Sequence, residues 1–142
     1  MASERTDFRV GESASLTRTI DDRMIRAFAE VTGDRNPIHL DDEYASATFF
    51  GGRIAHGMLV ASLISEVLGT QLPGAGAIYV GQQLNFRAPV RPGDTVTVRA
   101  EITDIDPERG RIAMSTVITN QRGETVIDGA AKLAMAGTLK RG

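Results

Sequence analysis

Two histidines occur in the chain, and both lie between Asp34 and Gly57. Asp34 precedes His39, and Asn36-Pro37 lies between them. Proline disfavours helix in the residue before it, so we expect the stretch from Asp34 to His39 to be a rigid loop. Aspartate is ionised at neutral pH and histidine titrates at about 6.5, so a water held between them can lose and regain a proton. Spacing alone also allows a structural role for both residues, in which Asp34 caps a turn and His39 is a partly buried loop residue.

The second candidate is Ala55-His56-Gly57, at the expected start of a helix. A helix N-terminus offers unpaired N–H groups and the positive end of the helix dipole. Glycine lets a ligand approach the backbone closely. These features suit a site that polarises a thioester carbonyl and stabilises the enolate formed from it. The alternative is that Gly57 only starts the helix.

Ser65 and Leu68 are three positions apart in the same expected helix, so they share a face and are candidates to line a ligand pocket. The last expected strand carries Gly129, Ala130 and Ala131, whose small side chains would leave a slot for an acyl tail if they face the helix. Alternatively, the Ser65 hydroxyl bonds the carbonyl one helical turn back.

Two further patterns are weaker. Asp34, His39 and His56 are a possible ligand set, but they lack close ligand spacing, so we expect no metal site. Gly74-Ala75-Gly76 leads into a strand and lacks a complete phosphate-loop pattern, so we interpret it as a turn.

Two helices must position these residues. Residues 22–32 form an amphipathic pattern, capped by Asp21 or Thr19 and ended by Gly33. Its apolar face comprises Met24, Ala27, Phe28 and Val31. Residues 57–68 are apolar almost all round, so other structure must cover this helix on every side. Asp41 can cap a short helical turn that reaches Tyr44.

The second half of the chain favours strands. Residues from Ile78 to Phe86, Val96 to Ile102, Ile112 to Ile118 and Thr125 to Met135 are separated by turn clusters that contain proline or glycine. The second and third of these alternate apolar and polar residues, which is typical of strands with one buried face. A buried helix with an antiparallel sheet predicts an α+β fold.

Length, charge and composition exclude several classes of function. With 142 residues, we expect one domain over residues 1–142. The net charge is −2 and no basic block occurs, so nucleic acid and anionic membranes are not expected partners. The absence of cysteine excludes disulfides, thiolate nucleophiles and cysteine-ligated metals, and suits a cytoplasmic protein. The polar N-terminus does not resemble a secretory signal, and the apolar run from Ile54 to Leu68 is too short and polar to span a bilayer.

Several motifs together resemble the MaoC-like hydratase family. They are the hydratase-2 motif from Phe28 to His39, Tyr44-Ala45, Ile54-Ala55-His56-Gly57-Met58, Tyr79, the run from Asn85 to Val90, and Gly93-Asp94. The resemblance covers about Ala27 to Leu133 and is strongest to short, single-domain (R)-specific enoyl-CoA hydratases of bacterial polyester (polyhydroxyalkanoate) and fatty-acid metabolism.

The resemblance implies a hotdog fold, with a sheet wrapped around one long helix, and a homodimer. It implies that Asp34 and His39 hold and activate water and that the Gly57 N–H binds the thioester oxygen. It also implies that Ser65 lies near the acyl pocket, and that Asn36 orients the loop and contacts the substrate. The implied reaction is hydration of a trans-2-enoyl-CoA to an (R)-3-hydroxyacyl-CoA. Asp34 is then the base, and His39 is a candidate to protonate C2. No cofactor is needed beyond the coenzyme A of the acyl-CoA substrate.

Two other functions compete with this interpretation. A hotdog thioesterase would attack the thioester carbonyl, and Glu66 in the central helix is the residue that hints at it. A non-catalytic acyl-CoA sensor would keep the pocket but would have no use for the pair Asp34 and His39.

Overall fold

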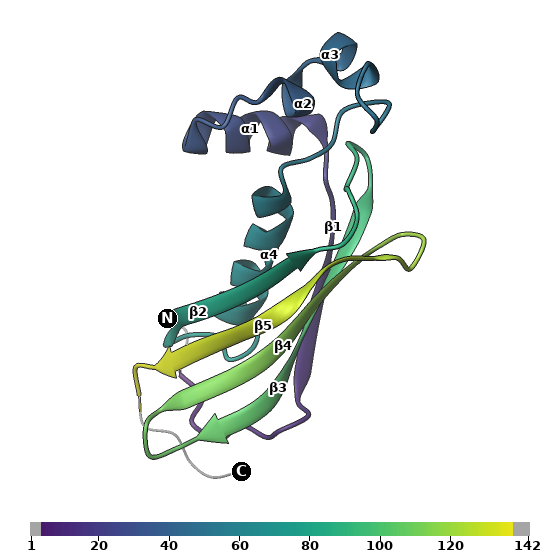
Figure 1. Ribbon diagram of the computed structural model, residues 1–142. Helices are drawn as coiled ribbons and strands as arrows, with labels where there is room; N and C mark the ends of the chain where they lie inside the picture. Colours follow the sequence, from purple (N-terminus) through teal and green to yellow (C-terminus); the bar gives the residue numbers. More distant parts are fainter. Residues whose placement is uncertain (1–3, 138–142) are drawn as a thin grey trace.

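The computed structural model describes residues 4–137, and five antiparallel strands form its sheet (Figure 1). Their order across the sheet is β1-β3-β4-β5-β2, so β1 and β2 form the two edges. The strands are β1 (Ser13–Thr19), β2 (Ala77–Phe86), β3 (Thr95–Asp106), β4 (Arg111–Asn120) and β5 (Thr125–Met135). This confirms the strands expected in the second half of the chain.

The helix α4 (Gly57–Thr70) packs against one face of this sheet (Figure 1). The expected period-two alternation is confirmed in β3 and β4, where every second side chain is buried over most of each strand. These side chains form the hydrophobic core with α4, which buries Leu59, Val60, Ala61, Leu63, Ile64, Val67 and Leu68. The sheet and helix therefore hold the start of α4 in a fixed place.

One stripe of α4 is not covered by the described residues, although its apolar pattern predicts that other structure wraps this helix. Met58, Ser62, Ser65 and Glu66 are exposed, and the Met58 side chain is 57% exposed. The apolar pattern correctly predicts a largely buried helix. It cannot show which molecule covers each side.

Three further helices form a separate layer beyond the N-terminal end of α4 (Figure 1). They are α1 (Asp22–Thr32), α2 (Pro37–Leu40) and α3 (Asp42–Ser46). As predicted, the Asp21 carboxylate caps α1 by accepting from the Met24 N–H at 2.9 Å. Gly33 ends the helix with φ 79°, and its N–H donates to the Ala29 carbonyl. The Asp41 carboxylate likewise caps α3 at the Tyr44 N–H.

The structure corrects the expected apolar face of α1. Its buried residues are Ile25 and Ala29, whereas Val31 is 86% exposed. Helical spacing identifies residues that share a face, but it does not identify the face that meets the core. Met24 and Phe28 are only partly buried, and with Leu59 and Leu63 of α4 they line an open apolar groove.

The structure also corrects the expectation of a loop through His39. Helix α2 begins at Pro37, and Asn36 caps it by accepting from the Ile38 N–H at 3.2 Å. Proline restricts the residue before it but suits the first helical position, where its fixed φ is helical and its missing N–H is not needed. His39 is therefore held on a turn of helix. Within residues 4–137, no helix is both long and apolar enough to cross a membrane.

Candidate active site

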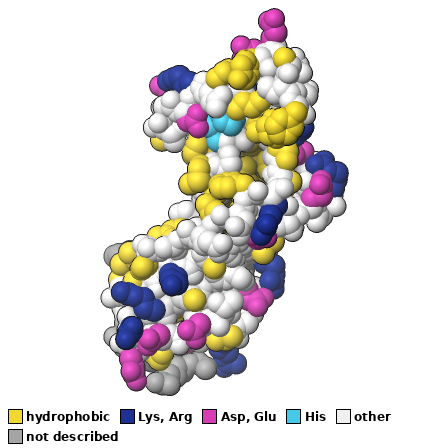
Figure 2. Space-filling model, in the orientation of Figure 1, with side chains coloured by type: hydrophobic (Ala, Val, Ile, Leu, Met, Phe, Trp, Pro, Cys, Tyr) yellow, Lys and Arg dark blue, Asp and Glu magenta, His cyan; other side chains and the backbone are white. Residues whose placement is uncertain are grey.

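The two histidines, which come from separate segments, stack on each other where the helical layer meets the sheet. Their ring centroids are 3.8 Å apart and their planes differ by 29°. His39 lies on α2, and His56 is the residue immediately before α4. The two side chains are 8% and 2% exposed. Figure 2 shows the histidines in a recess between hydrophobic side chains, with an acidic side chain beside them.

Backbone carbonyls determine which nitrogen of each neutral ring carries the proton. His39 Nδ1 lies 2.8 Å from the Ile54 carbonyl oxygen, which can only accept, so Nδ1 carries the proton and Nε2 is an acceptor. His56 Nε2 lies 3.0 Å from the Asp34 carbonyl oxygen, so it donates there. The resting His39 therefore has no proton on Nε2, and any proton that it delivers from this atom must first be taken up.

The surroundings of His39 favour this neutral form. Burial lowers the pKa of His39 below its ordinary value. The hydrogen bond to the Ile54 carbonyl opposes this effect, the neighbouring His56 lowers the pKa further, and the Asp34 carboxylate raises it. The net effect is a lowered pKa, so Nε2 is available as a proton acceptor at neutral pH.

Asp34 follows Gly33, the C-cap of α1, and its side chain is exposed. Its Oδ1 accepts from the Asn36 N–H at 3.2 Å, and its own N–H donates to Thr32 Oγ1 at 3.1 Å. These bonds hold the loop between α1 and α2. Asn36 acts here as the cap of α2, which fits the loop-orienting role that the resemblance implies; contact of Asn36 with substrate stays a prediction.

Ligand atoms of Asp34, His39 and His56 lie within 4.8 Å of one another. The residue types suit a divalent transition metal. Two of the four ring nitrogens are already engaged, because His39 Nδ1 and His56 Nε2 donate to the Ile54 and Asp34 carbonyls. The same arrangement suits a water molecule that lies beside Asp34 and His39.

Gly57 is the first residue of α4, and its N–H has no hydrogen-bond partner among the described residues. Such a first-turn N–H has no intrahelical acceptor. The site therefore combines two proton acceptors, the Asp34 carboxylate and His39 Nε2, with a free donor at the positive end of a helix dipole. It can move a proton and stabilise a developing oxyanion.

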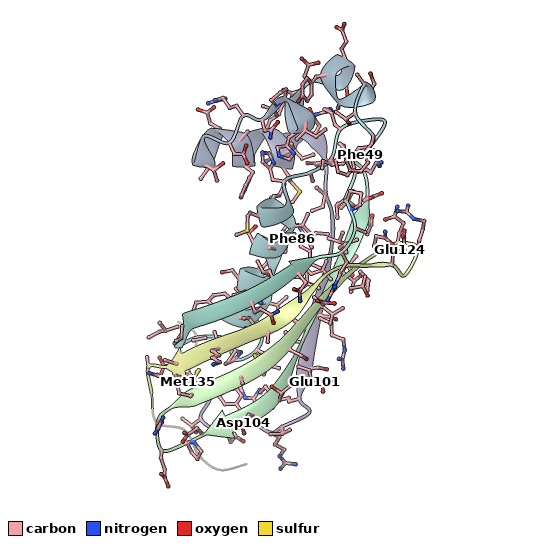
Figure 3. All side chains as sticks on the ribbon, viewed as in Figure 1. Phe49, Phe86, Glu101, Asp104, Glu124 and Met135 are labelled. Atoms are coloured by element: carbon pink, nitrogen blue, oxygen red, sulfur yellow. The ribbon has the colours of Figure 1, made fainter. Side chains whose placement is uncertain are left out.

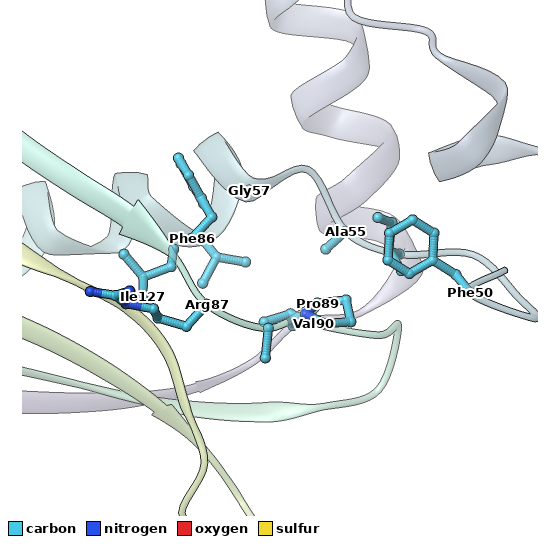
Figure 4. A pocket seen from close by; sticks show the side chains of 11 residues that line it. Phe50, Ala55, Gly57, Phe86, Arg87, Pro89, Val90 and Ile127 are labelled. Atoms are coloured by element: carbon cyan, nitrogen blue, oxygen red, sulfur yellow. The ribbon is translucent and has the colours of Figure 1, made fainter.

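A cavity of about 400 Å³ opens beside Gly57 (Figure 4). Its lining is mostly apolar and includes Phe50, Val60, Phe86 and Val90. Neither Phe50 nor Phe86 was among the expected pocket residues. For Phe86 the available signal was the run from Asn85 to Val90, which resembles the family pattern.

The structure separates the residues expected to form an acyl slot. Ser65 is exposed on the uncovered stripe of α4, whereas Leu68 is 1% exposed and belongs to the core. Ala131 is buried but Ala130 is exposed, because successive residues of a strand point to opposite faces. The small residues of β5 therefore cannot all line one slot, and neither Ser65 nor Leu68 lines the cavity beside Gly57.

Comparison with known proteins identifies relatives over most of the chain. Residues 7–124 match the MaoC like domain. The (R)-specific enoyl-CoA hydratase of Rhodospirillum rubrum is 50% identical, over 88% of this chain and 86% of that protein. The 3-hydroxybutyryl-CoA dehydratase of Methylorubrum extorquens is also 50% identical, over 88% of this chain and 79% of that protein.

A solved structure gives the same result for the fold. The (R)-hydratase of A. caviae, described as involved in PHA biosynthesis, superimposes with a TM-score of 0.88 at 41% identity, covering 90% of this chain and 97% of that chain. This confirms the expected hotdog arrangement, in which the sheet packs around α4. The chain belongs to the MaoC-like family.

Proposed function

We propose that the protein adds water to the double bond of a trans-2-enoyl-CoA, giving an (R)-3-hydroxyacyl-CoA, and catalyses the reverse dehydration. The observation that carries the proposal is the grouping of Asp34 and His39 near the free Gly57 N–H. The relatives named as (R)-specific enoyl-CoA hydratases support the substrate class. The thioester itself makes C3 electrophilic, so the reaction needs no redox or metal cofactor.

The dyad orients the attacking water. The Asp34 carboxylate and His39 Nε2 both accept hydrogen bonds, so each takes one O–H of the water and leaves an oxygen lone pair facing C3. As oxygen bonds to C3, the dyad removes one proton, with Asp34 as the base. The same proton returns to C2 from the same side, so the water's oxygen and both hydrogens are accounted for. His39 takes part in this return only after it has received a proton, because its resting Nε2 has none.

The start of α4 stabilises the charge that develops on the thioester. As oxygen attacks C3, electrons move onto the thioester oxygen, and the Gly57 N–H donates to this enolate. The positive end of the helix dipole lies at the same place. A donor that is fixed before the reaction needs no reorganisation during it, which is why such groups contribute strongly to catalysis.

The two arms of the substrate leave Gly57 on different sides of α4. The cavity beside Gly57 receives the pantetheine arm next to the thioester. The acyl chain follows the exposed stripe of α4 past Ser62 and Ser65, and Leu68 supports this stripe from the core. A second copy of the chain covers the stripe.

A homodimer supplies that cover. Strand β2 is an edge of the sheet, and Ile78, Tyr79 and Val80 are 53%, 40% and 54% exposed. An exposed apolar strand edge is a liability that pairing with another strand removes. Pairing of β2 with its counterpart would join the two sheets, and the exposed side chains of Met58 on α4 and Val31 on α1 argue for a second copy as well.

The decisive experiment follows the loss of absorbance of enoyl thioesters of several chain lengths, with chiral analysis of the product. Hydration that yields the (R)-alcohol supports the proposal, and intact enoyl-CoA contradicts it. Saturated acyl-CoA tests the thioesterase alternative and should remain intact. The position of Glu66 argues against thioester hydrolysis by this residue. Its carboxylate is exposed and pairs with Arg18 at 3.0 Å, and it lies more than two helical turns from Gly57.

A further inference from the structure

His56 contacts both members of the proposed dyad but has no part in the proton transfers described above. Its ring stacks on His39, and its Nε2–H donates to the Asp34 backbone carbonyl at 3.0 Å. The Phe28 ring packs on it as well, with centroids 4.9 Å apart. The side chain is 2% exposed. One buried ring therefore connects α1, the loop that carries Asp34, and α2.

We infer that His56 is a positioning residue, which sets the spacing between the Asp34 carboxylate and the His39 imidazole through its Nε2–H and its ring face. The inference rests on the proposed function. His56 does not contact the water or the substrate in this scheme. It acts by restraining the backbone at Asp34 and the ring of His39, because two acceptors share one water only when their separation is held closely.

The contacts of Asp34 show why this restraint matters. Asp34 is exposed, and its loop is otherwise held by local bonds to Thr32 and Asn36. Among the described residues, the bond from His56 is the one recorded hydrogen bond that ties Asp34 to a residue distant in the sequence. His39 is anchored separately, through Nδ1 to the Ile54 carbonyl. The other connection between them is local and runs through Asn36, whose N–H donates to Asp34 Oδ1 and whose carbonyl accepts from the His39 N–H. That path restrains the backbone at His39, whereas His56 alone also contacts the His39 ring.

The position of His56 in the chain extends the same restraint to the third proposed group. His56 immediately precedes Gly57, and its backbone carbonyl accepts from the Leu59 and Val60 N–H groups in the first turn of α4. The ring thus fixes the dyad relative to the helix start that holds the oxyanion donor. His56 Nδ1 has no hydrogen-bond partner among the described residues, whereas Nε2 bonds to the Asp34 carbonyl. The surroundings therefore stabilise the tautomer that carries its proton on Nε2.

Two substitutions separate the contributions of the ring and the N–H. In His56→Gln, the amide nitrogen reaches the place of Nε2, so the bond to the Asp34 carbonyl is kept while the ring stack is lost. In His56→Phe, the ring is kept and the bond is lost. We expect His56→Phe to lower kcat by about 10- to 100-fold with KM changed by less than about 3-fold, the scale expected when reacting groups are slightly misplaced. His56→Gln should retain more activity than His56→Phe.

A double-mutant cycle distinguishes positioning from a general structural role. If His56 acts through the dyad, His56→Phe should lower the residual activity of Asp34→Asn by no more than about 2-fold, since residues that act as a unit are not additive. Equal losses in both backgrounds would overturn the inference. So would wild-type kcat in His56→Phe, whereas wild-type activity in Asp34→Asn would instead overturn the proposed dyad.

Imidazole NMR supplies a readout that does not depend on turnover. In tag-free protein above the ordinary histidine pKa, two rings should appear, His56 as the Nε2–H tautomer and His39 as the Nδ1–H tautomer. His56→Gln leaves one ring, that of His39, which should keep its tautomer because Ile54 still accepts from it. An Nδ1–H tautomer for His56 in the wild type would refute the inference.

Discussion

Gly57 lies directly against the ring of Phe86. A Cβ atom at position 57 would be 2.7 Å from Phe86 Cε1, closer than carbon atoms normally approach. Figure 3 shows Phe86 at the end of β2, beside the first turn of α4. Glycine at this position therefore allows the last residue of β2 to pack on the start of α4, and so fixes the helix end whose free N–H is proposed to bind the thioester oxygen.

This contact predicts the effect of Gly57→Ala. The added methyl group meets the far end of the Phe86 side chain, which is 54% exposed and can turn away, so we expect the free energy of unfolding to change by no more than about 1 kcal/mol. We expect kcat to fall by about 10²-fold, because the displaced ring no longer holds the helix end that carries the oxyanion donor. Urea denaturation measures the stability of the variant. Wild-type kcat in Gly57→Ala would show that the contact does not position the N–H.

The dyad predicts a second set of variants. Asp34→Asn and His39→Ala should each lower kcat by about 10²-fold or more, the usual contribution of general acid–base groups. Asp34→Asn should fold with nearly unchanged stability, because the Asp34 side chain is exposed. His39→Ala removes the ring that stacks on His56, so circular dichroism must confirm its fold before its kinetics are interpreted. Near-normal hydration by either variant would exclude that residue from catalysis.

The lowered pKa of His39 predicts the sign of the pH dependence. The neutral ring is the active form, so kcat/KM should stay level as the pH falls through about 6.5, the ordinary histidine pKa, and decrease only below it. The stability that neutral His39 contributes is complete above the unfolded-state pKa and is lost as the pH falls through the lowered folded-state pKa. Urea titrations of the wild type and His39→Ala isolate this effect. An acid limb of activity above 6.5 would contradict the assignment.

Assembly gives the next prediction. Sedimentation at micromolar concentration should show about twice 15.2 kDa for the wild type. Val80→Lys places a charge on the exposed edge of β2 and should produce a monomer with reduced activity. Thr103→Lys is the matched control, since it adds the same charge at an exposed position of β3, away from that edge. A fully active wild-type monomer would mean that one chain completes the site alone.

Sequence reasoning works best where a residue's role depends on its neighbours in the chain. The caps at Asp21 and Gly33 and the alternation in β3 and β4 depend on local spacing, so they were predictable. The start of α2 at Pro37 is also a local feature, because proline favours the first position of a helix. The expectation of a loop rests only on the exclusion of proline from helix interiors.

The remaining errors concern contacts between distant segments. Nothing in the spacing of α1 shows that Ile25, and not Val31, meets the core, because this depends on how α1 lies on its neighbours. The stack of His56 on His39 likewise requires the ends of two separate segments to meet. Both histidines occur in one short region, and that was the available signal for His56. The expectation of one domain over 1–142 stays a prediction, because residues 1–3 and 138–142 lie outside the described residues.

Chain-length preference gives the final prediction, and the structure changes how it is tested. Leu68→Ala would enlarge the expected acyl slot, but Leu68 is 1% exposed in the core. Its truncation should therefore lower the free energy of unfolding by about 2–5 kcal/mol, and a change in folding would be mistaken for a change in specificity. Ser65 is exposed on the uncovered stripe of α4, so it can be enlarged without disturbing the core of the subunit.

Ser65→Leu should therefore lower kcat/KM for long enoyl-CoAs and leave crotonyl-CoA turnover largely intact, because only a long tail reaches past this position on the stripe. Each buried methylene contributes roughly 0.8 kcal/mol when it fits, so every carbon excluded should lower kcat/KM by about 4-fold. Ser65→Ala is the matched control, since it removes the hydroxyl without adding bulk, and it should preserve the wild-type preference. Equal losses at every chain length in a Ser65→Leu variant that sediments like the wild type would show that the acyl chain does not follow this stripe.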